Sequence, residues 1–92
     1  MNNARRKAIR NVISQLKKPD PNWNMIESEL NSILDEETDA MDNIPESLQD
    51  TDRYQICEES IDYLDSAIGE IDPEDPECAE TIIDILEQID GI

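Results

Sequence analysis

The sequence predicts an all-α protein that folds as an antiparallel bundle of three to four helices with short, proline-marked connections. Apolar residues recur every three or four positions along nearly the whole chain, and prolines separate the stretches that show this period. No stretch alternates apolar and polar residues, and no Asn-Gly or Asp-Gly turn joins two apolar stretches. The 92 residues indicate a single domain, 1–92.

The first two helices are predicted over residues 3–18 and about 21–43. The first has an apolar stripe made of Ala8, Ile9, Val12, Ile13 and Leu16. Prolines 19 and 21 stop it, and Asp20-Pro21 is expected to start the second helix, with Asp20 as the cap. The stripe of the second helix is made of Trp23, Ile26, Leu30, Ile33, Leu34 and Met41. We expect Asn43 to end it in a left-handed conformation, since Pro45 follows.

The second half of the chain predicts a connector and two more helices. Residues 44–52 form the connector, with one short turn at 45–48. A helix over 51–71 has a seam made of Cys57, Ile61, Leu64, Ile68 and Ile71. A last helix covers about 76–90, and Gly91 stops it. Its apolar arc is wide, which indicates a packed partner within the chain or in a second copy; the candidates for self-association are Ile82, Ile83, Leu86 and Ile89.

Charge is divided sharply along the chain. Six of the seven basic residues lie in residues 1–18, and all 24 carboxylates lie in residues 19–92, where Arg53 is the one cation. The two parts therefore have charges of +6 and −23, for a net charge of −17. Three interpretations fit the basic helix. It packs on the acidic body, which we favour, or it is a solvated amphipathic face, or it contacts nucleic acid or anionic lipid.

The composition excludes several classes of function. The chain has no histidine, so Ser-His, Cys-His and other His-based catalysis is excluded, and we expect a protein that is not an enzyme. Cys57 and Cys78 are expected to be reduced core residues, and no metal or cofactor is predicted. No apolar run approaches the roughly 20 residues of a membrane span, so we expect a cytoplasmic protein that does not bind membranes.

One segment resembles a known group of proteins. Residues 35–49 read DEETDAMDNIPESLQ, which is similar to a D-E-E-x-x-A-x-D-N-x-P-E-S-L-Q signature of small acidic helical proteins encoded by phages and prophages. In that family a basic N-terminal helix precedes the signature and an acidic helix follows it. No activity is firmly assigned to the family. The resemblance implies a phage or mobile-element origin, a helical fold and residence in the host cytoplasm.

The density of carboxylates is the strongest functional signal. A helical body with rows of carboxylates can occupy the nucleic-acid-binding surface of a basic protein, because its charges replace phosphates. We therefore expect a phage-type protein that blocks a host nucleic-acid-binding or defence protein by mimicking nucleic acid. The candidate contact residues are Glu27, Glu29, Asp35, Glu36, Glu37, Asp39, Asp42, Glu58, Glu59, Asp62 and Asp65. Direct nucleic-acid binding is not expected, since the body repels polyanions.

Two alternatives remain open from the sequence. In the first, the protein is a structural or assembly module, a helical homodimer whose acidity serves only solubility. In the second, Glu58, Glu59 and Asp62 form an E-E-x-x-D pattern similar to that of all-helical nucleotide pyrophosphatases, which bind Mg²⁺ through such carboxylates.

Overall fold

The computed structural model describes residues 2–48, 51–75, 77–89 and 91–92, and in these ranges it confirms the all-α bundle. The elements in chain order are α1 (Asn3–Leu16), α2 (Trp23–Asp42), the one-turn 3-10 helix η1 (Glu46–Leu48), α3 (Asp52–Gly69) and α4 (Cys78–Glu87). Each α-helix lies inside its predicted range, and η1 occupies the predicted connector turn. Pro76 and Asp90, the predicted ends of the last helix, lie outside the described residues.

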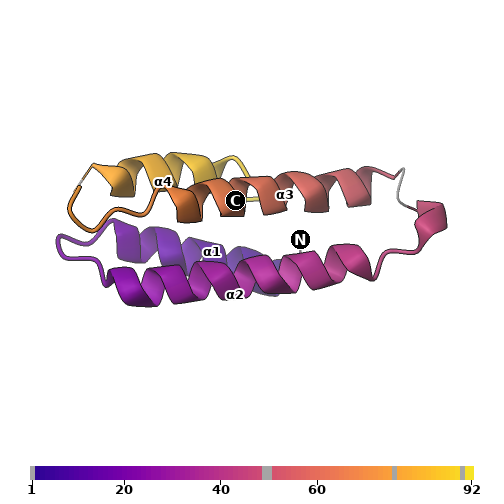
Figure 1. Cartoon of the computed structure of the whole chain (residues 1–92), viewed down its shortest axis with the longest axis horizontal. Coiled ribbons are helices and arrows are strands. Elements are labelled where there is room, and N and C mark those ends of the chain that lie inside the picture. The colour runs from indigo at the N-terminus through magenta and orange to yellow at the C-terminus, as the bar shows by residue number, and fades with distance from the viewer. Residues whose placement is uncertain (1, 49–50, 76, 90) are drawn as a thin grey trace.

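The four α-helices form an elongated up-down-up-down bundle. Successive helices pack against each other, and α1 closes the bundle by packing against α4 (Figure 1). The Cα positions extend over 46 × 19 × 18 Å. The helices differ in length, with 14 residues in α1, 20 in α2, 18 in α3 and 10 in α4. At the end of the bundle that bears η1, α2 and α3 therefore extend past the other two helices (Figure 1).

Asparagine side chains determine where the first two helices begin. The Arg5 amide donates to Asn2 Oδ1 at 2.8 Å, and the Met25 amide donates to Asn22 Oδ1 at 3.2 Å. Such bonds satisfy amides that lack a partner within the helix. The prediction that Asp20 caps the second helix was wrong, because Asn22 lies closer to the first amides. Asn43 does end α2, but its φ of −84° is right-handed rather than left-handed.

The core is aliphatic and draws on all four α-helices. Its fully buried members include Ile9, Ile26, Leu30, Leu64, Ile82 and Leu86. The predicted seam of α3 was partly wrong, because Ser60 and Ala67 are buried with Cys57 and Leu64, whereas Ile61 and Ile68 are half-buried. Small side chains are not recognised as core residues by their hydrophobicity, although they fit where two helices pack closely.

The apolar arc of α4 faces its own chain. Ile82, Leu86 and Ile89 have exposed fractions of 0%, 0% and 2%, since they fill the core between α4 and its neighbours. The prediction that these three residues form a self-association surface was therefore wrong. Of the four candidates, Ile83 alone remains half-buried. The wide apolar arc of α4 therefore packs on the other helices of the same chain.

Candidate functional site

The predicted carboxylates of α2 and α3 include two rows on the outside of the bundle. Asp35, Asp39 and Asp42 follow the i, i+4, i+7 spacing on α2, and the same spacing recurs on α3. The row of α3 is made of Glu58, Asp62 and Asp65. All six side chains are exposed. Residues at this spacing share one helix face, with neighbouring Cβ atoms about 5–6 Å apart.

The packing of α2 on α3 determines how the two rows lie relative to each other. Cys57 of α3 is in contact with Glu37 of α2, which aligns the antiparallel helices at these positions. In this register, residues 58–65 of α3 lie beside residues 29–36 of α2, so the two rows follow one another along the bundle. The six carboxylates then span about 20 Å of helix axis, with a mean separation of about 3.9 Å, near the spacing of about 3.4 Å along one strand of DNA.

Four of the remaining predicted carboxylates lie apart from these rows. Glu27 and Glu59 are exposed on other parts of α2 and α3. Glu29 and Glu36 line a shallow groove between α2 and α1. Glu29 is half-buried there and accepts a hydrogen bond from Gln15 Nε2 at 3.4 Å. The predicted contact carboxylates therefore face several sides of the bundle, and they are most closely spaced in the two exposed rows.

Glu37 is the exception among the predicted contact residues. Its exposed fraction is 0%, and its Oε2 accepts a hydrogen bond from Arg5 Nε at 2.9 Å. The prediction that Glu37 lies on the acidic surface was wrong, since position 37 continues the buried stripe of Leu30 and Ile33. A buried carboxylate needs a compensating charge, which Arg5 of the basic helix supplies.

A third carboxylate row lies on α4, outside the predicted set. Glu80, Asp84 and Glu87 have the same i, i+4, i+7 spacing and are exposed. Each is two positions away from a buried residue, Ile82, Leu86 or Ile89, so the row faces away from the core. Because α4 packs on α3 and α1, its outer face is not part of the α2 face that bears the first row. The row of α4 was missed as a unit because the candidate set covered only α2 and α3.

The exposed rows are not neutralised within the chain. None of the nine row carboxylates makes an ion pair with a residue in the described ranges. The rows of α2 and α3 therefore attract counterions, which a basic partner would release on binding, whereas Glu80 and Glu87 of the α4 row line the same hollows as Lys17, Lys18 and Arg10. This is the electrostatic property that a nucleic-acid surface also has.

The basic helix packs on the acidic body, as favoured from the sequence. Besides the Arg5–Glu37 pair, Arg10 Nη2 donates to the Gly91 carbonyl oxygen at 2.7 Å. Gly91 has a φ of +84°, and a Cβ atom at this position would clash with the Arg6 side chain. The left-handed backbone of the C-terminal turn therefore favours glycine there, whereas the end of the flexible Arg6 side chain could shift to make room for a Cβ atom.

Cys57 is a buried thiol beside the same ion pair. Burial raises its pKa above the ordinary value of 9.0, and hydrogen bonding to the Glu37 carboxylate raises the pKa further. The thiol is therefore protonated at neutral pH and is not a reactive nucleophile. Cys57 and Cys78 are both free and buried, which confirms that they are core residues.

The raised pKa of Cys57 predicts a loss of stability at alkaline pH. The folded state holds the thiol proton more tightly than the unfolded state, so this contribution is complete below about pH 9 and is lost as the pH rises through the folded-state pKa. We expect the free energy of unfolding of the Cys57→Ala variant to fall less between pH 8.5 and 10.5 than that of the native protein. Urea titrations at each pH measure this, and a Cys57→Ala variant that retains the native slope would contradict the prediction.

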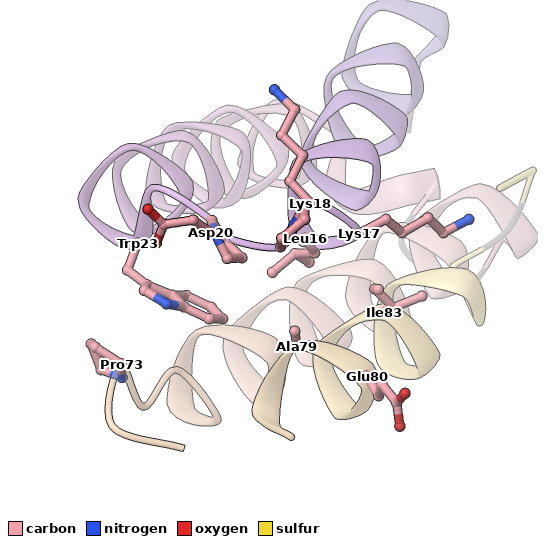
Figure 2. Close-up of a pocket in the computed structure, with 11 residues that line it drawn as sticks. Leu16, Lys17, Lys18, Asp20, Trp23, Pro73, Ala79, Glu80 and Ile83 are labelled. Atoms are coloured by element: carbon pink, nitrogen blue, oxygen red, sulfur yellow. The ribbon is translucent and has the colours of Figure 1, made fainter. Parts of the chain in front are cut away.

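A hollow of about 590 Å³ lies at the opposite end of the bundle from η1. Trp23, Leu16, Ala79 and Ile83 contribute apolar surface to it, while Lys17 and Lys18 extend away from the indole ring (Figure 2). Trp23 is half-buried beside the turn that joins α1 and α2, where it packs as the sequence predicted. Lys17, Lys18, Asp20 and Glu80 supply the charged side chains of its lining.

The comparisons with known proteins provide no relative. No protein-family model, no curated protein and no solved structure matches the chain. In residues 2–48, 51–75, 77–89 and 91–92, no group of three or more Cys, Asp or Glu side chains has an arrangement that would hold a metal ion. Nor does any helix within those ranges have the length and apolar character needed to span a bilayer. The site must therefore be interpreted from its own geometry.

Proposed function

We propose that this protein is a non-enzymatic acidic helical protein that occupies the nucleic-acid-binding surface of a basic host protein. The observation that carries the proposal is the pair of exposed rows on α2 and α3, six carboxylates at nearly the axial spacing of phosphates along a DNA strand. Lysine and arginine side chains that bind phosphates would bind these carboxylates instead. The likeness of residues 35–49 to phage-encoded proteins makes a host defence or nucleic-acid-binding protein the expected class of target.

The packing of the basic helix supports this proposal over direct nucleic-acid binding. Arg5 is paired through its Nε with the buried Glu37, and Arg10 is bonded to the C-terminal turn. The rows on α2 and α3 meanwhile have no ion-pair partner among the described residues. A polyanion approaching either row would be repelled, whereas a cationic protein surface would be attracted from a distance of about a Debye length, roughly 8 Å at physiological salt.

Neither alternative function has comparable support. The apolar arc of α4 is used inside the bundle, which leaves a helical dimer without an evident interface. Glu58, Glu59 and Asp62 lie on the outer side of α3 and are exposed to solvent. A Mg²⁺ site of the pyrophosphatase kind would need such carboxylates to converge with others from a second helix.

The proposal predicts a salt-sensitive partner that is displaced from nucleic acid. Tagged protein would be used to capture partners from a bacterial lysate at about 50 mM and about 300 mM salt, a range over which contacts of this kind weaken sharply. The captured protein would then be purified and bound to a labelled DNA or RNA. We expect capture only at low salt, and release of the labelled nucleic acid when this protein is added.

The second step is what makes the test specific. A basic protein captured at low salt through unspecific attraction would keep its nucleic acid when the acidic protein is added. A partner retained at about 300 mM salt would indicate apolar recognition instead. Either result would contradict nucleic-acid mimicry.

A further inference from the structure

A pocket beside the start of α1 collects three of the seven basic residues of the chain. It has a volume of about 320 Å³ and is lined by Asn2, Arg5, Arg6, Ala40, Arg53, Ile56 and Cys57. It lies where α2 and α3 continue past the first turn of α1, so side chains of three helices meet there. No carboxylate is among the described residues that line it, although 24 of the 92 residues of the chain are acidic.

The three arginines reach the pocket from different helices. Arg5 and Arg6 lie in the first turn of α1, and Arg53 lies in the first turn of α3. Arg53 is the single cation of the acidic body, so its position beside the two arginines of α1 is a result of folding alone. The N-termini of α1 and α3 are at this same end of the bundle, and their helix dipoles add to the positive potential.

The guanidinium groups of Arg5 and Arg53 retain capacity to bind a ligand. Arg5 is held by the bond from its Nε to Glu37, and among the described residues its terminal nitrogens have no other partner. Arg53 is exposed and makes no hydrogen bond or ion pair with any residue in the described ranges. Arg6 also donates to Asn3 Oδ1 at 3.3 Å, which helps to hold it in place. A fixed Arg5 and a free Arg53 provide a rigid donor and an adaptable one.

We propose that this pocket binds a small oxyanion, a phosphate or carboxylate group on a ligand of modest size. Guanidinium groups form paired hydrogen bonds with both kinds of oxyanion, and the half-buried side chains of Ala40 and Ile56 offer apolar walls to the rest of the ligand. Glu37, 2.9 Å from Arg5 Nε, offsets one of the three positive charges, and carboxylates of the acidic body farther than about 8 Å are largely screened at physiological salt. This inference is independent of the proposed mimicry.

The experiment is a titration of the full chain with inorganic phosphate and, separately, with acetate, against sodium chloride at the same ionic strength. Nuclear magnetic resonance signals of the backbone and of the arginine Nε–H groups provide the readout. We expect the signals of Arg5, Arg6 and Arg53 to shift with a saturable dependence. Saturation by phosphate alone assigns the site to phosphate ligands, and stronger saturation by acetate assigns it to carboxylate ligands.

Two matched variants separate the pocket from general electrostatics. Arg53→Gln removes one charge-assisted donor, so it should weaken binding about tenfold. Lys7→Gln removes the same charge from an exposed position of α1 outside the pocket, so it should leave the affinity unchanged within about twofold. The proposal is overturned if neither anion saturates the signals of the arginines, or if both variants weaken binding equally.

Discussion

The Arg5→Met variant is expected to unfold far more easily than any variant with a surface cation removed. Arg5 holds the fully buried carboxylate of Glu37, and loss of one member of such a pair typically costs about 3–5 kcal/mol. We expect a loss of about 3 kcal/mol here, since the Arg5 side chain is itself 14% exposed and water can partly replace it. For a small domain with a net charge of −17, a loss of this size is a large part of the total stability.

Urea unfolding followed by circular dichroism measures this effect, with Lys7→Met as the control. Both variants remove one cation from α1 and so increase the repulsion of the acidic body equally, but Lys7 is exposed. The control should cost no more than about 0.5 kcal/mol. The double variant Arg5→Met, Glu37→Leu should recover most of the loss, because no carboxylate is then left in the core. If Arg5→Met proved as mild as the control, Glu37 would have sufficient compensation from elsewhere.

The second large effect is expected from neutralising the carboxylate rows. Three triple variants each remove three negative charges from one helix: D35N/D39N/D42N on α2, E58Q/D62N/D65N on α3 and E80Q/D84N/E87Q on α4. If α2 and α3 form the contact, each of the first two variants should weaken binding to the captured partner at least tenfold. Their combination should weaken binding at least about 100-fold. Six contacts of this kind lower the affinity by several powers of ten when the salt concentration rises moderately, so the direct removal of all six should have an effect of at least this size.

The α4 variant is the matched control for the loss of net charge. It should change the affinity by less than about threefold, because its row lies outside the proposed contact and acts only through the screened overall field. Circular dichroism should show that all three variants keep their helices, and reduced self-repulsion should raise their thermal stability. Equal weakening by all three variants would mean that bulk charge alone drives binding, and no weakening would leave the acidity as a determinant of solubility.

The sequence by itself determined the helices and their order. The three-four spacing of isoleucine and leucine and the positions of Pro19, Pro21 and Pro45 depend only on local backbone chemistry, so the ranges of all four α-helices were predictable. The exposure of the rows on α2 and α3 was equally local, because residues two positions from a buried stripe face solvent. The residue at which each helix begins was less predictable, because it depends on which side chain reaches the first free amides.

Only the tertiary structure decided which polar residues leave the surface and which distant residues meet. Glu37 is buried because Arg5, 32 positions earlier in the chain, supplies a charge to it. Arg53 shares a pocket with Arg5 and Arg6 because α2 and α3 extend past the first turn of α1, so that the first turns of α1 and α3 lie at the same end of the bundle. Hydrophobic periodicity describes one helix at a time. A buried charge or a shared pocket is a property of two or more helices, because the interaction energy depends on the distance between groups that folding brings together.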